Sequence, residues 1–383
     1  MINRKASKKL SLLAKEYGVV SVTGPRQSGK TTLVKEHFPN HQYYNLEFLS
    51  DLEKISSDPV GFINSISNGV IIDEVQRYPD ILSYIQVAID DNFKPAKFVI
   101  TGSQNLLLSD KVSQSLAGRV GILKLLPLSI SELDMSDLLP DSFQKQILKG
   151  FYPSIYDKDQ TPNLYYANYL NTYVERDVRS IKNVGDLSSF TRFLQLMAGR
   201  VGQILNLSEI GGVVGANHKT ISSWISILEA SYIVFRLEPY YQNFGKRLIK
   251  SPKIYFTDVG LAAHLLRLDT VDEIRNYHGL GNLFENMIIA DLQKQIFNEL
   301  KSDNLYYFRD NKGLEIDVLI DSGNKILPIE IKSSATFSSS FLANLQQFKK
   351  ISGIKTAKLI YSGEGGQEVS GVSLNNYKRF RLS

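Results

Sequence analysis

The sequence predicts an α/β protein whose N-terminal part is a parallel β-sheet covered by helices. Within residues 1–135, short apolar runs alternate with helical or turn-rich stretches, which is the order of repeated strand–helix units. The runs are as short and as uniformly apolar as strands buried on both faces of a parallel sheet. The expected strands are Val19–Thr23, Tyr43–Leu46, Val70–Ile72, Phe98–Thr101 and Ile122–Leu125.

The chain of 383 residues is long enough for two or three domains of roughly 150 residues each. We expect one boundary near residue 135, where the acidic stretch Asp134–Asp141 follows the sheet, and another near residue 275. Residues 136–275 are expected to be mainly helical. Residues 276–383 are expected to fold as helix, strand, strand, strand, helix, strand. The clearest middle helices are Tyr165–Val178, Ser188–Gly199 and Thr220–Glu229.

Composition is typical of a soluble globular protein, with 43% hydrophobic and 22% charged residues. We expect no membrane span, because no uncharged apolar run approaches the roughly 18 residues that one requires. The basic N-terminus is not followed by a long apolar stretch, so we expect no secretory signal. The absence of cysteine excludes disulfides and thiolate metal sites and predicts a cytoplasmic location. The net charge of +5 permits nucleic-acid binding without indicating it.

The strongest motif follows the first expected strand and fits the pattern G-x-x-x-x-G-K-[ST]. The strand Val19–Val22 enters it and a helix at Thr31–His37 leaves it, which is the setting that a phosphate-binding loop needs. Backbone N–H groups and the helix N-terminus would surround phosphate oxygens. Lys30 would reach the β- and γ-phosphates, and the Thr31 hydroxyl would bind Mg²⁺. The alternative is a glycine-rich turn with an exposed lysine. The predicted nucleotide-binding residues are Gly24, Pro25, Arg26, Gln27, Ser28, Gly29, Lys30, Thr31 and Thr32.

A second motif agrees with this hypothesis independently. Val70–Ile72 has the pattern of a buried strand and is followed by two carboxylates, Asp73 and Glu74. Asp73 would hold the metal ion, and Glu74 would polarise the attacking water. Adjacent acids favour hydrolysis over transfer to an acceptor hydroxyl. The alternative is an acidic strand end without a catalytic role.

Two further assignments rest on weaker patterns. Ser103 or Gln104, at the end of the Phe98–Thr101 strand, could sense the γ-phosphate or align the water. Arg119 could contact the γ-phosphate in its own subunit or in a neighbouring one, and an ordinary surface arginine is an equal alternative. The predicted catalytic set is therefore Glu74, Lys30, Arg119 and Ser103.

The middle of the chain carries a helix-turn-helix pattern. An expected helix at Leu207–Val213 is followed by a glycine-containing turn and by Thr220–Glu229, which has one apolar face. Two expected strands, Tyr232–Leu237 and Lys253–Phe256, are joined by a basic, aromatic connection. This order predicts a winged helix that contacts the backbone of double-stranded DNA. Protein contact is the alternative.

Acidic and basic residues recur in the last zone. An expected helix at Asn282–Gln295 contains Glu285, and Asp317 and Glu330 precede Lys332. In a strand, Glu330 and Lys332 lie on the same face, about 7 Å apart. With Asp317 on a neighbouring strand, two carboxylates and an ammonium would converge, as metal-assisted phosphodiester cleavage requires. A solvated sheet edge is the alternative.

The whole chain resembles one family, the bacterial and archaeal AAA+-type ATPases with a C-terminal domain of the PD-(D/E)xK nuclease-like superfamily. The residues that carry this resemblance are Gly24–Thr32, Asp73-Glu74-Val75-Gln76, Thr101-Gly102-Ser103, Leu116-Ala117-Gly118-Arg119, Pro127-Leu128-Ser129, Tyr173-Val174-Glu175-Arg176-Asp177, Ser251–Leu261, Leu283-Phe284-Glu285-Asn286 and Pro328-Ile329-Glu330-Ile331-Lys332.

The resemblance implies ATP and Mg²⁺ at an N-terminal P-loop ATPase domain, a winged-helix middle and a C-terminal nuclease-like (restriction-endonuclease-like) fold. It implies Glu285, Asp317, Glu330 and Lys332 as the nuclease-like set, with no member replaced. Our leading hypothesis is an ATPase coupled to DNA. The alternatives are an ATP-regulated, metal-dependent DNA nuclease and a non-enzymatic ATP-dependent switch that contacts a protein or DNA. A homo-oligomer would be required if Arg119 acts on a neighbouring subunit.

Overall fold

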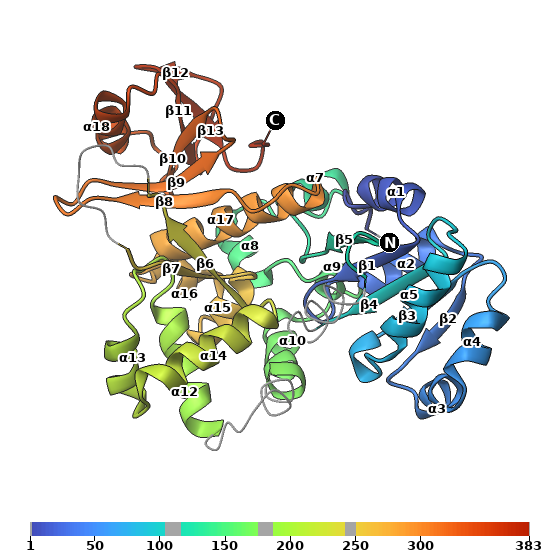
Figure 1. Cartoon of the computed structure of the whole chain (residues 1–383). Helices are drawn as coiled ribbons and strands as arrows, with labels where there is room; N and C mark the ends of the chain where they lie inside the picture. Colours follow the sequence, from blue (N-terminus) through green and yellow to red (C-terminus); the bar gives the residue numbers. More distant parts are fainter. Residues whose placement is uncertain (1, 104–115, 175–186, 242–249, 383) are drawn as a thin grey trace. The chain divides into compact units, whose positions relative to one another are not determined.

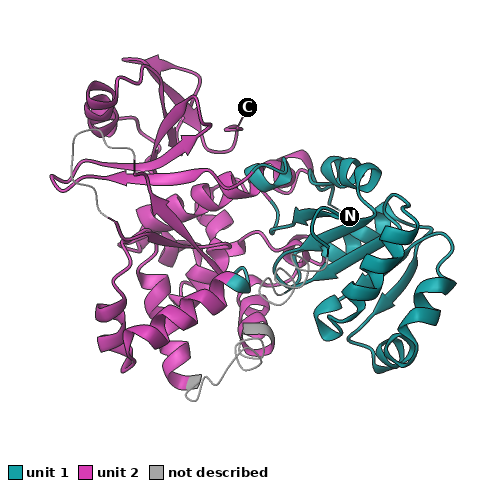
Figure 2. Cartoon of the chain, in the orientation of Figure 1, with its two compact units in different colours: residues 1–128, 230–232, 296–301 teal, residues 129–229, 233–295, 302–383 magenta. Residues whose placement is uncertain are grey.

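The computed structural model describes residues 2–103, 116–174, 187–241 and 250–382 (Figure 1). Contacts divide the chain into two compact units (Figure 2). Unit 1 is Met1–Leu128 with the short segments Ala230–Tyr232 and Ile296–Lys301, and unit 2 is the remainder. The middle and C-terminal zones therefore fall within one unit, and the division into three domains stays a prediction.

Unit 1 is built on a five-stranded sheet in the order β2-β3-β4-β1-β5, with all neighbouring strands parallel. The three inner strands are buried along their whole length, which explains their continuous apolar runs. These inner strands match the sequence prediction to within one residue. The strands are β1 (Val19–Thr23), β2 (Gln42–Asn45), β3 (Val70–Asp73), β4 (Phe98–Gly102) and β5 (Val120–Lys124).

The edge strand β5 departs most from its prediction, beginning at Val120 instead of Ile122. Its side chains alternate, so that Gly121 and Leu123 are buried while Ile122 is 48% exposed. An edge strand has one neighbour and a partly open face, so its ends are poorly marked by apolar residues.

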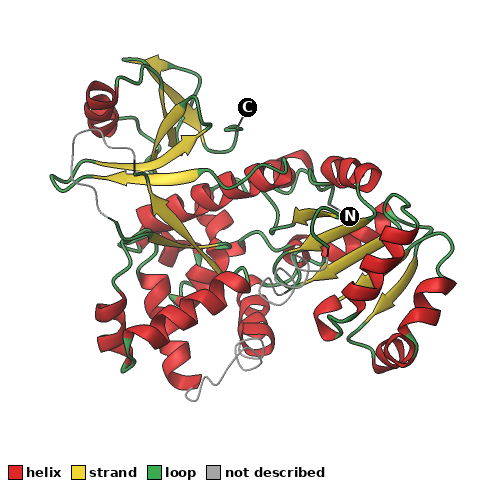
Figure 3. Ribbon diagram, viewed as in Figure 1, coloured by secondary structure: helices red, strands yellow, loops and turns green. Residues whose placement is uncertain are grey.

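Helices cover both faces of this sheet (Figure 3). Successive residues of β1 point to opposite faces, so Val19 packs in one core cluster and Val20 in the other. Helices α1 and α2 contribute to the Val20 cluster, and α3, α4 and α5 to the Val19 cluster. The helices are α1 (Ser7–Glu16), α2 (Lys30–His37), α3 (Leu49–Ser57), α4 (Pro59–Ser65), the 3₁₀ turn η1 (Val75–Arg77) and α5 (Ile81–Asp91).

The chain after β5 is mainly helical up to the last sheet. The described part of the predicted segment Tyr165–Val178 forms α10 and the π-helix η2, and residues 175–178 lie outside the described residues. The predicted link Asp134–Asp141 begins inside α7, and α7 itself begins with a capping box formed by Ser129 and Glu132. The helices are α7 (Ile130–Met135), α8 (Phe143–Lys149), α9 (Pro153–Asp157), α10 (Pro162–Tyr169), η2 (Leu170–Val174), α12 (Leu187–Gly199), α13 (Leu207–Val214), α14 (His218–Ala230), α15 (Val259–Leu265), α16 (Val271–Asn276), α17 (Leu280–Asn298), the 3₁₀ turn η3 (Ser339–Leu342) and α18 (Ala343–Ser352).

The buried Asp258 ties several of these helices together. Its carboxylate accepts hydrogen bonds from the Tyr166 hydroxyl (2.6 Å), the Phe151 N–H (2.7 Å) and the Leu261 N–H at the start of α15 (3.1 Å). Gly260 lies against the Tyr166 hydroxyl, where a Cβ atom would come within 2.4 Å. This stretch of the Ser251–Leu261 motif is therefore explained by packing and capping.

Unit 2 contains an eight-stranded sheet in the order β12-β13-β11-β10-β9-β8-β6-β7. The expected order of the last zone corresponds to α17, β8, β9, β10, α18 and β11, to which β12 and β13 are added. The hairpin β6–β7 joins this sheet through a short parallel pairing of Glu238 and Pro239 with β8, which the sequence did not indicate. The strands are β6 (Val234–Pro239), β7 (Lys253–Phe256), β8 (Leu305–Arg309), β9 (Glu315–Asp321), β10 (Ile326–Lys332), β11 (Ala357–Tyr361), β12 (Glu368–Val369) and β13 (Val372–Asn376).

The central position of β4 predicts a large effect of core truncation. Ile100→Ala should destabilise unit 1 by about 2–5 kcal/mol, because Ile100 is completely buried. Leu49→Ala, at a side chain that is 72% exposed, should change stability by about 0.5 kcal/mol or less. Urea unfolding followed by circular dichroism tests this, and equal midpoints for the two variants would contradict the placement of β4.

Candidate functional site

The turn between β1 and α2 adopts a conformation that requires glycine at two positions. Gly24 has φ +155°, and a Cβ atom there would lie 2.0 Å from the Leu125 carbonyl oxygen. Gly29, which precedes α2, has φ +93°. The loop therefore lies tightly against the chain after β5, as a phosphate-binding turn must.

Lys30 is buried inside this loop. Its ammonium donates to the carbonyl oxygens of Gly24 (2.9 Å) and Pro25 (2.8 Å). The Ser28 hydroxyl is also buried and has no hydrogen-bond partner among the described residues. A buried cation and an unsatisfied hydroxyl within one loop fit an anionic ligand such as a phosphate.

Two arginines, one inside the loop and one outside it, stabilise the loop through polar contacts. Arg26 forms an ion pair with Glu47 at 3.2 Å. Arg4 donates to the carbonyl oxygens of Ser28 (2.7 Å) and Leu126 (2.6 Å). Sequence reasoning treated Arg4 only as part of a basic N-terminus, and no local pattern links a residue before α1 to a loop 24 positions later.

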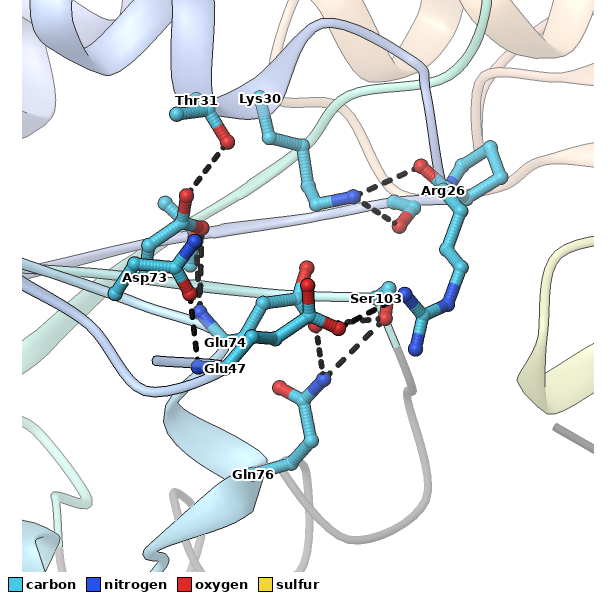
Figure 4. Close-up of polar contacts among 12 residues, drawn as sticks. Arg26, Lys30, Thr31, Glu47, Asp73, Glu74, Gln76 and Ser103 are labelled. Atoms are coloured by element: carbon cyan, nitrogen blue, oxygen red, sulfur yellow. Dashed lines mark hydrogen bonds and ion pairs between the residues drawn. The ribbon is translucent and has the colours of Figure 1, made fainter. Parts of the chain in front are cut away.

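Asp73 is the centre of the polar contacts at the carboxyl end of the sheet (Figure 4). It accepts hydrogen bonds from the hydroxyls of Thr31 on α2 (2.7 Å), Tyr43 on β2 (2.8 Å) and Thr101 on β4. Burial and the Asp73 carboxylate raise the pKa of Tyr43, so its hydroxyl stays protonated and donates. Thr31 and Asp73 offer the oxygen ligands that Mg²⁺ prefers, and they fit the predicted metal site.

Glu74 follows in a left-handed conformation, with φ +56°. Few residues other than glycine adopt this conformation, and it occurs frequently at functional sites. Its carboxylate accepts hydrogen bonds from the Ser103 hydroxyl (3.0 Å) and the Gln76 amide. The Gln76 amide also lies 3.3 Å from the Ser103 hydroxyl, so the end of β4 and the turn after β3 hold Glu74 jointly (Figure 4).

The structure thus brings Lys30, Thr31, Asp73, Glu74 and Ser103 together at the carboxyl ends of the strands. Sequence reasoning missed Tyr43 and Thr101 as partners of Asp73. Each lies in a strand directly beside β3, and Thr101 also belongs to the Thr101-Gly102-Ser103 motif of the family resemblance. Gln104 lies outside the described residues.

Arg119 lies at the other end of the strands, where their amino ends are. It precedes β5, and the next residue, Val120, is paired with Val19 at the start of β1, whereas the phosphate loop follows the end of β1. Its guanidinium binds the Asp90 carboxylate at 2.9 Å. The structure therefore does not bring Arg119 to the phosphate loop of its own subunit, and contact with a neighbouring subunit stays a prediction.

A second polar cluster lies on β9 and β10 in unit 2. The Lys332 ammonium is 2.7 Å from the Glu330 carboxylate and 3.4 Å from that of Asp317. The Ile331 N–H donates to Asp317 at 2.8 Å. Antiparallel pairing of the strands explains the convergence, because Ile329 is paired with Val318 and Glu330 therefore falls opposite Asp317.

Glu285 on α17 reaches the same cluster, together with residues that sequence reasoning had not included. Lys253 on β7 lies 3.4 Å from Glu285 and also contacts Glu315 on β9. The Tyr255 hydroxyl donates to Glu285. Lys253 and Tyr255 are two apart on one strand and so share a face.

Burial and mutual attraction set the charges of this cluster. Burial and the Asp317 charge raise the pKa of Glu330 well above its usual range. Burial alone would raise the pKa of Asp317, but Lys332 and Lys253 outweigh it and lower that pKa. Burial by itself would lower the pKa of Lys253, but the negative charges of Glu285, Asp317 and Glu315 outweigh burial and raise that pKa. Among the described residues, no three or more His, Asp or Glu side chains are arranged to hold a metal ion.

The predicted basic connection between β6 and β7 is only partly available for DNA. Arg236 forms a bidentate pair with Glu229 at 2.7 Å, and Lys253 is buried in the cluster. Lys250 is exposed. The remaining basic residues, Lys246 and Arg247, and the aromatic Phe244 lie outside the described residues, as does Glu175-Arg176-Asp177.

Three protein families match consecutive parts of the chain. Residues 16–134 match an AAA domain. Residues 140–272 and 280–379 match two domains of unknown function, DUF8612 and DUF4143.

Curated relatives span most of the chain. An uncharacterised protein of Mycobacterium tuberculosis is 29% identical over 342 residues, which cover 88% of this chain and 75% of the relative. An uncharacterised protein of Methanocaldococcus jannaschii is 24% identical over 346 residues, covering 80% of this chain and 73% of the relative.

Solved structures give distant likenesses. The Walker-type ATPase PABY2304 of Pyrococcus abyssi is 14% identical with a TM-score of 0.47, and the match covers 69% of this chain and 96% of that chain. The RuvB Holliday junction branch migration motor of Thermotoga maritima is 18% identical with a TM-score of 0.33, and the match covers 61% and 90%. In the part of the chain that the structure describes, no helix has both the length and the apolar character to cross a lipid bilayer.

The contacts of Asp73 predict the effect of removing one hydroxyl. Thr101→Val keeps the shape of the side chain but removes its hydrogen bond to a buried carboxylate. We expect Mg²⁺-dependent binding of a fluorescent ATP analogue to weaken about tenfold. Thr336→Val, at an exposed position in unit 2, should bind as the wild type does. Unchanged binding by Thr101→Val would remove Thr101 from the site.

Proposed function

We propose that this protein binds ATP with Mg²⁺ and hydrolyses it, in the part of the chain (residues 16–134) that matches an AAA domain. The single observation that carries the proposal is the convergence at the carboxyl edge of the sheet. There, Thr31 from the phosphate loop meets Asp73 at 2.7 Å, and Glu74 follows directly with its carboxylate held by Ser103.

Each residue has a role that its contacts support. Lys30 and the backbone N–H groups of the loop would bind the phosphates, and Thr31 and Asp73 would hold Mg²⁺. The metal ion would offset the negative charge of the phosphate oxygens. Glu74 would orient the attacking water and accept its proton. Ser103 and Gln76 both donate to Oε2 of Glu74, so its Oε1 atom would be the one that accepts the proton from the water.

The partner that we propose is double-stranded DNA, bound by a winged helix in the middle of the chain. Helix α13, the left-handed Gly215 and helix α14 are followed by the hairpin β6–β7. His218 and Lys219, in the first turn of α14, are exposed. This order of elements, with a basic helix start, suits contact with a DNA backbone. A protein partner is the alternative.

ATP hydrolysis can be tested by phosphate release. Lys30→Ala should abolish nucleotide binding, whereas Glu74→Gln should retain binding and lose roughly 10²- to 10⁴-fold in turnover, because it keeps the shape of the base and removes its charge. Glu36→Gln, at an exposed position on α2, is the matched control. Persisting turnover in Glu74→Gln would refute the assigned base, and wild-type turnover well below about 1 s⁻¹ would favour an ATP-dependent switch.

Double-stranded and single-stranded DNA should be added to the same assay. Stimulation that is lost in Glu74→Gln supports an ATPase coupled to DNA. Turnover that is indifferent to both DNAs would support a protein partner for the middle of the chain.

A second candidate function is metal-dependent cleavage of DNA by the unit 2 cluster. The observation that favours it is that Asp317, Glu330 and Lys332 lie together on two adjacent strands. One Glu330 oxygen is buried there and has no hydrogen-bond partner in the part of the chain that the structure describes. The carboxylates would hold a divalent metal ion, and Lys332 would orient the attacking water.

Nicking of supercoiled plasmid in Mg²⁺ or Mn²⁺ tests this second function. Asp317→Ala and Lys332→Ala should each abolish nicking, because each removes a member of the cluster. Lys325→Ala, at an exposed turn between β9 and β10, should leave it intact. Nicking that survives both cluster substitutions would show that the activity belongs to another site or to a contaminant.

A further inference from the structure

Lys253 is enclosed by carboxylates that come from two other elements. Its ammonium lies 3.4 Å from Glu285 on α17 and contacts Glu315 on β9. Asp317, two residues further along β9, adds its attraction. The Lys253 side chain is only 3% exposed, so this cation serves the interior of the cluster and cannot meet a ligand at the surface.

We propose that Lys253 is a built-in cation that closes the unit 2 carboxylates to divalent metal ions, and that its withdrawal opens the metal site. The inference rests on the second function proposed above, because a metal site is what Lys253 would close. It assigns a regulatory role to the hairpin β6–β7, which carries Lys253 and Tyr255 into the cluster.

The charges of the cluster support this assignment. Four carboxylates face three cations, since Arg309 also pairs with Glu315 at 3.2 Å. A divalent cation that binds these carboxylates would have to compete with the Lys253 ammonium for Glu285 and Glu315. Loss of the Lys253 charge would leave buried carboxylates uncompensated, and a hard cation could then replace it.

An independent observation points to a ligand in the same place. The Glu330 side chain is 1% exposed, and its Oε1 atom has no hydrogen-bond partner among the described residues, while Oε2 accepts from Lys332. Such an atom in a buried polar cluster is expected to have a partner in some functional state.

The test is Mn²⁺ binding to the full chain without nucleotide, followed by electron paramagnetic resonance. We expect weak binding by the wild type and at least tenfold tighter binding by Lys253→Gln. The new site should disappear in Lys253→Gln with Asp317→Asn, because Asp317 would be a ligand. Lys325→Gln, at an exposed position, should match the wild type. A folded Lys253→Gln protein that binds Mn²⁺ no better than the wild type overturns the proposal.

A second variant covers the case in which Lys253→Gln does not fold. Glu315→Gln removes an ion partner of Lys253 while keeping the lysine, so it should loosen Lys253 and also tighten Mn²⁺ binding. A wild-type chain that already binds Mn²⁺ tightly, in a manner lost in Asp317→Asn, overturns the proposal without any Lys253 variant.

Plasmid nicking separates this inference from the function on which it rests. If Lys253→Gln gains an Asp317-dependent Mn²⁺ site but nicks no DNA, the closing role of Lys253 stands and the nuclease function fails. If the wild type nicks DNA through Asp317 and Lys253→Gln leaves Mn²⁺ affinity unchanged, the nuclease function stands and the role of Lys253 fails.

Discussion

The carboxylate of Asp73 is the constraint on which the geometry of unit 1 depends. A buried carboxylate is strongly unfavourable unless hydrogen-bond donors surround it. Asp73 obtains them from the helix α2 and from β2 and β4, the two strands that flank β3 in the sheet. The same bonds that satisfy Asp73 fix Thr31 at the end of the phosphate loop. Stability of the sheet and position of the proposed metal ligands are therefore one requirement.

The two polar sites of the protein treat a buried lysine in opposite ways. Lys30 donates to the neutral carbonyl oxygens of Gly24 and Pro25, and its proposed role is to bind phosphate. Lys253 is held by carboxylates, so its positive charge is neutralised within the protein. Burial alone therefore does not distinguish a binding lysine from a structural one. The charge of the oxygen atoms around the ammonium makes that distinction.

A motif in the sequence can mark packing as well as chemistry. Asp258 lies in one of the motifs that carry the family resemblance, yet its carboxylate is satisfied by Tyr166, Phe151 and Leu261 and caps α15. Glu330, equally buried, keeps one oxygen without a hydrogen-bond partner among the residues that the structure describes. The difference between a fully satisfied carboxylate and an unsatisfied one separates a structural role from a candidate site.

The sequence by itself determined the features that depend on neighbouring residues. The inner strands of unit 1 could be located because burial on both faces demands continuous apolar runs, and the phosphate loop because its turn requires Gly24 and Gly29 at fixed spacing. The pairing of Glu330 with Lys332 followed from the period of a strand. These signals depend only on residues that are close in the sequence, so they can be read without the tertiary structure.

Only the tertiary structure decided which distant residues meet. Strand order placed Tyr43 and Thr101 beside Asp73. Strand register placed Arg119 at the amino ends of the strands, away from the phosphate loop. The short pairing of β6 with β8 brought the hairpin into the second sheet. Lys253, on the other strand of the hairpin, β7, thereby lies among carboxylates from other elements. Order and register are set by the packing of whole faces against each other, so no local pattern in the sequence records them.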